Sequence, residues 1–278
     1  MQNADSTAAY LHHLQIGSPD PARLAAYYRD ALQTQVSSIG DGALLCSGPR
    51  RRTLFAPGKA GELQYSAFAC RDANALEGLR DFVRDKGVPL EASPSPLFGG
   101  DAFGVRDPDG NLVLFGLAGK DPAVAAGING PIQHVTVTST DPGRMEAFYA
   151  GQLGFAVSDR VRNDAGAVTT VFFRCNHEHH TIGCFLKTEA GLDHHSYEAG
   201  EWITIRDWAD HLAKLRIPIV WGPGRHGPGN NLFIFIKDPD GNMIEISAEL
   251  EVVHDRPVGE WPHEPYTLNM WGPAIMRS

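Results

Sequence analysis

The chain has 278 residues, of which 42% are hydrophobic and 21% are charged, and its formal net charge at pH 7 is −9. This length and composition predict two globular domains of ordinary size. The acidic balance argues against nucleic-acid binding, and no apolar run is long enough to cross a bilayer, so we expect a soluble cytoplasmic protein that binds neither nucleic acid nor membranes.

The first half of the chain carries signals for both strands and helices. Residues 11–16 alternate in a way that predicts a strand, and Asp20-Pro21 then supplies a helix N-cap followed by proline at the first helical position. Residues 23–32 and 75–86 have apolar side chains at helical spacing. The segment Asp107-Pro108-Asp109-Gly110-Asn111 predicts a tight turn, and residues 112–115 a strand that leaves it.

The same series returns in the second half, after a linker at residues 119–131 that is rich in Ala, Gly and Pro. It comprises a strand at 132–137, Asp141-Pro142, helices at 144–153 and 208–215, the turn at 238–242 and a strand at 243–246. Because the two series match element by element, the chain is predicted to be a tandem repeat. Each copy reads β-α-β-β-β twice, with strands and helices intermixed, which predicts an α+β fold of two tandem domains.

The two copies differ in their metal-binding residues. The second copy has His134, His194 and Glu245, each on a predicted strand, whereas the matching positions of the first copy hold His13, Tyr65 and Leu114. Two histidines and one carboxylate are the usual ligands of a mononuclear non-haem Fe(II), and they leave open positions for substrate and O₂. A single histidine in a strand is more often structural, but three such residues at repeat-equivalent positions predict one metal site in the second copy.

The second copy also contains longer motifs. Gly224-Arg225-His226 is followed after a short spacer by Phe233-Ile234-Phe235, and then by Asp238-Pro239-Asp240-Gly241 and Glu245. Leu-x-His-x-x-aromatic-Glu spans residues 192–198, and Cys-Asn-x-x-His-His-Thr spans residues 175–181. In these motifs the chain resembles the two-domain, type I extradiol ring-cleavage dioxygenases of the vicinal oxygen chelate (glyoxalase, bleomycin resistance and dioxygenase) superfamily. One position departs from the family signature, because Phe235 stands where the family usually has tyrosine.

The resemblance implies a fold in which each domain is a pair of βαβββ modules that form a curved, partly open sheet around a cavity. We expect an N-terminal domain without a metal site at residues 1–120, a catalytic metal-binding domain at residues 131–250, and a C-terminal extension at residues 251–278. The extension shows little periodicity and is expected to pack irregularly over the second domain.

The resemblance also assigns roles to single residues. It makes His134, His194 and Glu245 the ligands of Fe(II), with Mn(II) as the alternative metal. His180 is implied as the acid/base residue, with the adjacent His179 as its main rival, and His226 is implied to hydrogen-bond the bound catecholate.

Three aromatic positions around these residues complete the predicted site. Phe235 and Tyr197 are expected to contact the substrate, and Phe235 lacks the hydroxyl that family members are thought to place near the substrate and iron. Tyr197 or Tyr266 is a candidate for a replacement hydroxyl. His195 is adjacent to a ligand, so strand alternation predicts that it points to the opposite face of the sheet.

The activity implied by the resemblance is extradiol (meta) cleavage of a catechol-type diol, with a small aromatic diol and O₂ as partners and a homo-oligomer as the expected assembly. Two alternatives remain: a glyoxalase-like isomerase or lyase, and a non-catalytic protein that binds aromatic compounds. The isomerases typically draw ligands from both modules, and a binding protein needs neither three ligands nor two helper histidines. Both arguments favour the dioxygenase.

Overall fold

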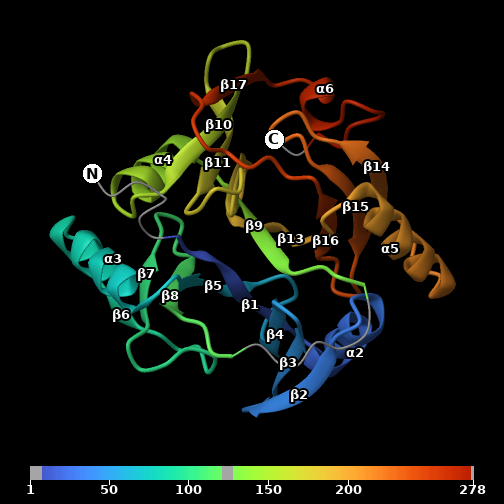
Figure 1. Cartoon of the computed structure of the whole chain (residues 1–278), viewed down its shortest axis with the longest axis horizontal. Coiled ribbons are helices and arrows are strands. Elements are labelled where there is room, and N and C mark those ends of the chain that lie inside the picture. The colour runs from blue at the N-terminus through green and yellow to red at the C-terminus, as the bar shows by residue number, and fades with distance from the viewer. Residues whose placement is uncertain (1–7, 121–127, 277–278) are drawn as a thin grey trace.

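This computed structural model describes residues 8–120 and 128–276. Its strands form two mixed sheets (Figure 1). The first sheet has the strand order β2-β3-β4-β1-β5-β8-β7-β6, and the second has the order β14-β15-β16-β13-β9-β12-β11-β10-β17. Within each half, both copies of the βαβββ module contribute to the same sheet. The predicted α+β fold of tandem domains is therefore confirmed.

The first half contains two modules. Their elements are β1 (Tyr10–Ser18), α2 (Pro21–Ala31), β2 (Gln35–Gly40), β3 (Ala43–Gly48), β4 (Arg51–Pro57), β5 (Leu63–Cys70), α3 (Ala73–Asp85), β6 (Glu91–Ala92), β7 (Phe103–Arg106) and β8 (Leu112–Leu117).

The second half repeats this order and ends in the C-terminal extension. Its elements are β9 (Ile132–Ser139), α4 (Pro142–Gly151), β10 (Ala156–Arg162), β11 (Val168–Arg174), β12 (Ile182–Leu186), β13 (Gly191–Glu198), α5 (Trp202–Lys214), β14 (Trp221–Arg225), β15 (Leu232–Lys237), β16 (Met243–Ala248), β17 (Gly259–Pro262) and α6 (Pro265–Leu268).

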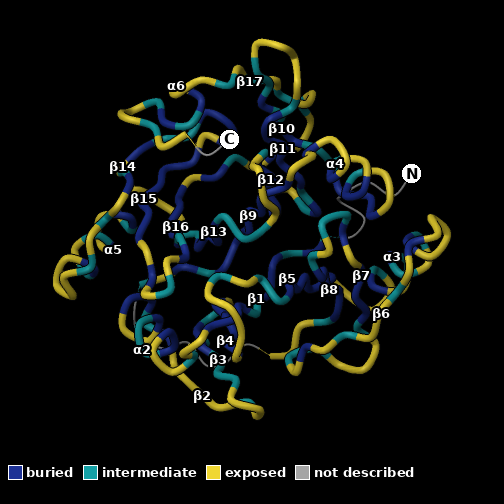
Figure 2. Tube along the Cα trace, turned by 180° about the vertical axis from the view of Figure 1, so that it is seen from behind, coloured by how far each residue is buried: buried dark blue, intermediate teal, exposed yellow. Residues whose placement is uncertain are grey.

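Local sequence explains where the first helix of each half begins. The side chains of Asp20 and Asp141 accept hydrogen bonds from the backbone N–H groups of Arg23 and Arg144, and a proline occupies the first turn of both helices. The helices cover the outside of the sheets, so that their outer faces are exposed while the central strands are buried (Figure 2). No helix of the described residues is long and apolar enough to cross a membrane.

One Asp-Pro-Asp-Gly-Asn turn of the first half binds a helix of the second half. The Tyr149 hydroxyl on α4 donates to Oδ2 of Asp107 over 3.0 Å, and Arg144 on the same helix forms an ion pair with Asp109. Gly110 has a φ of +88°, which glycine adopts without strain and which closes the turn. The turn therefore joins the two halves as well as two strands.

The corresponding turn of the second half makes the same contacts in the opposite direction. The Tyr28 hydroxyl on α2 donates to Oδ2 of Asp238 over 3.2 Å, and Arg23 forms an ion pair with Asp240. In Figure 1, α2 accordingly lies beside the second half, α4 lies beside the first, and β1 and β9 run next to each other between them. The interface between the halves is thus built from equivalent residues of the repeat.

The C-terminal extension is more ordered than its sequence predicts. β17 pairs in parallel with β10 and adds an edge strand to the second sheet, and α6 follows it (Figure 1). The backbone of Gly227 donates to the carbonyl of Thr267, and the backbone of Met270 donates to the carbonyl of Arg225. These bonds hold the extension against the segment that carries His226.

Candidate metal centre

The three residues predicted to bind metal lie on three adjacent strands of the second sheet: His134 on β9, His194 on β13 and Glu245 on β16. Nε2 of His134 is 3.0 Å from Oε2 of Glu245 and 3.4 Å from Nε2 of His194, and the remaining pair is 3.3 Å apart. Ligand atoms about 2.1 Å from one metal lie roughly 3.0 Å apart at right angles and roughly 3.4 Å apart in a tetrahedron. The three atoms are therefore spaced to hold one ion.

The charges of these side chains also suit a divalent cation. Burial lowers the pKa of His134, and histidine binds metals in its neutral form. Burial alone would raise the pKa of Glu245, but the adjacent rings of His134, His194 and His226 hold it well below its usual range. The site thus presents a buried, ionised carboxylate, and a bound cation would neutralise its negative charge.

Two further residues, which the sequence did not identify, orient the ligands. Oδ1 of Asp193 lies 2.7 Å from Nδ1 of His194 and so directs Nε2 of that ring to the metal position. The side-chain amide of Asn231 donates to Oε1 of Glu245 over 3.2 Å and to Oγ of Ser247 over 2.9 Å. The acidic neighbour of His194 is a signal that sequence reading could have used, whereas the contact of Asn231 depends on strand pairing.

We expect Asp193→Asn to weaken metal binding by about 10- to 100-fold, the usual cost of losing an outer carboxylate partner of a ligating histidine. Competition of the purified protein with a metal chelator measures the affinity. Lys187→Met is the matched control, because Lys187 forms an ion pair with Asp193 at 2.9 Å and its loss leaves the contact with His194 in place. Equal affinities for Asp193→Asn and the wild type would contradict this role.

The metal position opens into a cavity between the second sheet and the C-terminal extension. The cavity contains about 430 Å³ of space between protein atoms, part of which is open to solvent. Its lining combines the three ligands with apolar side chains and a few polar groups. The lining includes Val161, Phe172, His180, Phe185, His226 and Leu268.

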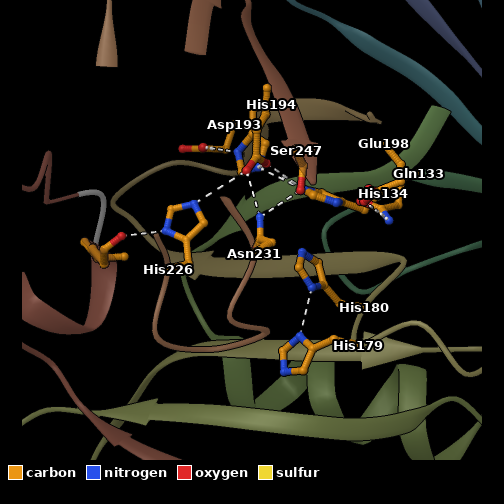
Figure 3. Close-up of polar contacts among 12 residues, drawn as sticks. Gln133, His134, His179, His180, Asp193, His194, Glu198, His226, Asn231 and Ser247 are labelled. Carbon is orange, nitrogen blue, oxygen red and sulfur yellow. Dashed lines mark hydrogen bonds and ion pairs between the residues drawn. The ribbon is translucent and has the colours of Figure 1, made fainter. Parts of the chain in front are cut away.

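His180 and His226 both reach this cavity, on either side of the ligands (Figure 3). The ring of His180 lies 4.2 Å from that of His134, centroid to centroid, and burial lowers the pKa of His180 well below its ordinary value. Nδ1 of His226 is 2.5 Å from the Leu268 carbonyl oxygen and donates to it, so Nε2 faces the carboxylate of Glu245 at 3.5 Å. Both rings therefore carry a nitrogen on the cavity side.

The two histidines adjacent to predicted site residues lie elsewhere. His179 is fully buried behind His180 and does not line the cavity. His195 points away from the metal position, where its Nε2 lies 2.9 Å from the Tyr28 hydroxyl of the first half. The expected direction of His195 is therefore confirmed.

The prediction that Tyr197 contacts the substrate is wrong. Its hydroxyl is 2.8 Å from Oγ1 of Thr53 in the first half, and its ring lies 5.4 Å from the ring of His195, on the face of β13 opposite to His194. Tyr266 is 60% exposed and does not line the cavity. Neither tyrosine replaces the hydroxyl that is absent at position 235.

Phe235 lies beside the metal position without lining the cavity. It is opposite Glu245 in the β15–β16 register, and its ring is 5.3 Å from that of His194 and 5.1 Å from that of Trp221. The side chain is 1% exposed. Phe235 therefore packs against a ligand, and its contact with substrate stays a prediction.

The equivalent region of the first half is filled by apolar side chains. Phe98 packs against Tyr65 and Leu114, and its ring is 4.9 Å from that of His13, whose Nε2 is 2.7 Å from Oγ of Ser95. Among the residues that the structure describes, His134, His194 and Glu245 are the one group of three or more His, Cys, Asp and Glu side chains close enough to share a metal. The two copies thus differ in the packing of this region as well as in their metal-binding residues.

A protein-family model described as "Glyoxalase/Bleomycin resistance protein/Dioxygenase superfamily" matches residues 10–115 and 131–246. The chain belongs to this superfamily. The two matched segments cover most of the two sheets, with β17 outside them, and the second segment contains all three metal-binding residues. The resemblance stated from the sequence motifs is therefore confirmed.

Relatives with assigned activities match over most of the chain. Metapyrocatechase 2 of Cupriavidus necator is 28% identical across 95% of this chain and 89% of its own length, and an iron-dependent extradiol dioxygenase of Rhodococcus jostii is 24% identical across 81% of each. A manganese-dependent 2,3-dihydroxybiphenyl 1,2-dioxygenase of Geobacillus genomosp. 3 is 28% identical over 52% of this chain. Homoprotocatechuate 2,3-dioxygenase of Arthrobacter globiformis has the same fold, with a TM-score of 0.83, 21% identity, and coverage of 99% of this chain and 91% of its own.

Proposed function

We propose that this protein is an extradiol dioxygenase that cleaves a catechol-type ring beside its two hydroxyl groups and adds both atoms of O₂ to the product. The observation that carries the proposal is the placement of His180 and His226 on the cavity that the His134, His194 and Glu245 side chains also line. A metal-binding protein without catalysis needs the three ligands alone. Two further histidines facing the same space supply what a ring-opening reaction needs for its proton transfers.

The residues fit Fe(II) or Mn(II), and the relatives include proteins named for each metal. The bound ion would lower the pKa of the diol and bring its two adjacent oxygens and O₂ together. His134 and His194 would hold it as neutral ligands, and Glu245 would neutralise one of its charges.

His180 is the proposed acid/base. Because burial lowers its pKa, the ring is neutral at physiological pH and its cavity-side nitrogen can accept a proton from a substrate hydroxyl. The same nitrogen then returns a proton during ring opening. Its position beside the His134 ring places it next to the diol oxygens of a substrate held at the metal position.

His226 and the apolar wall are proposed to orient the substrate. The Leu268 carbonyl fixes the Nδ1 proton of His226, so that Nε2 accepts a hydrogen bond from a substrate hydroxyl. Val161, Phe172 and Phe185 form the apolar part of the lining, and they suit an aromatic ring from which water is excluded. These side chains would set which substituents the ring can carry.

Oxygen uptake tests the proposal. The protein is purified without oxygen, loaded separately with Fe(II) and Mn(II), and mixed with catechols carrying small or bulky substituents. We expect uptake of one O₂ per diol together with a yellow ring-opened product. Hydroquinone and resorcinol are matched controls, because their hydroxyls are not adjacent and cannot both reach one metal. No uptake with any catechol on either metal-loaded form would refute the proposal.

A further inference from the structure

Behind His180, the buried side chains of His179 and Asp159 form a row of polar contacts that leads away from the cavity. Nδ1 of His180 lies 2.9 Å from Nδ1 of His179 (Figure 3). Nε2 of His179 lies 3.0 Å from Oδ2 of Asp159, close enough for charge attraction although outside the angle of a good hydrogen bond. Neither His179 nor Asp159 lines the cavity, so neither touches a bound substrate directly.

Asp159 is surrounded by hydrogen-bond donors. Its Oδ1 accepts from the backbone N–H of Gly259 over 3.1 Å and lies 2.9 Å from Nη1 of Arg256, and its Oδ2 accepts from Nε1 of Trp261 over 2.8 Å. Burial alone would raise the pKa of this carboxyl, but His179, Trp261 and Arg256 hold it below its ordinary value. Asp159 is therefore a buried carboxylate with hydrogen-bond donors beside both of its oxygens.

The carboxylate decides which ring nitrogens carry protons. An N–H at Nε2 of His179 is attracted to Asp159, whereas a lone pair there would be repelled. In neutral His179, Nδ1 is then an acceptor, and the contact of 2.9 Å requires Nδ1 of His180 to donate. Neutral His180 consequently has its lone pair on Nε2, the nitrogen on the cavity side.

We propose that Asp159 and His179 are positioning residues that hold His180 in the tautomer able to accept a proton from the substrate. The inference rests on the proposed function, in which His180 is the acid/base. The arrangement has the logic of a Ser-His-Asp triad, in which a buried carboxylate fixes the tautomer of the histidine base. In such a triad, replacing the aspartate by asparagine lowers kcat by about 10⁴-fold while the geometry stays intact.

Close packing keeps the side chains of His179 and His180 in place. A Cβ atom added to Gly229 would lie 2.9 Å from Nδ1 of His179, so the backbone at this position touches the ring. The Phe172 ring contacts both histidines, with centroids 5.4 Å from His179 and 4.9 Å from His180. Asp159 follows a register shift in the β10–β11 pairing, and such bulges re-aim side chains next to active sites.

Asp159→Asn is the first test. The amide of the asparagine turns its N–H group toward one of the four donors that surround position 159. If that donor is His179, the other tautomer of His179 is favoured, and with it the other tautomer of His180. We expect kcat to fall on the order of 10²-fold, with unchanged metal content and unchanged affinity for the diol without oxygen. Glu251→Gln is the matched control, because Glu251 is the other carboxylate on Arg256, with 2.6 Å between Oε1 and Nε. Its kcat should stay within about twofold of the wild type.

Two variants of His179 separate positioning from packing. Glutamine can donate to Asp159 and accept from His180, whereas leucine fills the space without either bond. We expect His179→Gln to recover a large part of the activity that His179→Leu loses. Equal loss in both variants would overturn the proposal.

The tautomer can also be read without any turnover. In full-length protein labelled with ¹⁵N-histidine and loaded with diamagnetic Zn(II), long-range ¹H–¹⁵N NMR shows which nitrogen of His180 is protonated. We expect Nδ1–H in the wild type and Nε2–H in Asp159→Asn. Nε2–H in the wild type, unchanged kcat in Asp159→Asn, or a parallel loss of metal binding would overturn the inference. Absence of diol-dependent oxygen uptake by the wild type would instead refute the proposed function.

Discussion

Replacing Glu245 by alanine is expected to remove the bound metal and to abolish turnover. Glu245 is the one anionic member of the ligand set, and without it two neutral histidines remain to hold a divalent cation. Metal affinity should fall by well over the roughly 10- to 100-fold that follows loss of an outer partner of a ligand. Elemental analysis of the anaerobically purified protein and oxygen uptake with a catechol measure both effects.

Glu249→Gln is the matched control for this experiment. Glu249 follows β16 by one residue and pairs with Arg225 at the surface, with a side chain that is 41% exposed. This variant should retain the metal and the activity of the wild type. Full metal content and full activity in Glu245→Ala would show that the ligand assignment is wrong.

His180→Ala is expected to retain the metal and to lower kcat by about 10²- to 10⁴-fold, the range that general acid/base residues contribute. The ring contacts the His134 ring but is not one of the three side chains spaced to share an ion, so its removal should leave the ligands in place. Single-turnover oxygen uptake with a saturating catechol isolates the chemical step from substrate binding.

His177→Ala provides the control within the same loop. His177 does not line the cavity, and its Nδ1 lies 3.2 Å from the carbonyl oxygen of Val253. A change of less than about twofold in kcat is expected for it. A similar kcat for His180→Ala and the wild type would remove His180 from the mechanism.

The repeat explains why so much of the fold could be predicted. Asp20-Pro21 and Asp141-Pro142 are local signals, and the helices that follow them begin where the caps require. α5 has no such signal, because the Glu201 side chain makes no capping bond. Its first turn also exposes Trp202 and Ile203, which obscures the apolar face. The sequence therefore predicted this helix to begin six residues too late.

The site was predictable where a residue could be compared with its counterpart in the other copy. His134, His194 and Glu245 stood out because the first copy keeps a histidine, His13, at one of these positions but has Tyr65 and Leu114 at the other two. Asn231 and Asp159 could not be found this way, since their roles depend on strand pairing and on a bulge.

The error at Tyr197 was avoidable in physical terms. Side chains alternate along a strand, so Tyr197 shares the face of His195, two residues away, and not that of His194. The rule that correctly placed His195 therefore also placed Tyr197 against the first half. Tyr197 is therefore a residue of the interface between the halves, although it belongs to the same sequence motif as His194.

The reciprocal contacts between each turn and the opposite helix make the interface between the two halves symmetric. Tyr28 with Asp238 and Tyr149 with Asp107 are the same bond made twice, once in each direction. Such pairing is characteristic of an isologous interface, in which one patch meets its own copy across a two-fold axis. Two separate chains with a single copy each would make these contacts as a homodimer. Either copy can therefore keep these bonds while its metal ligands change.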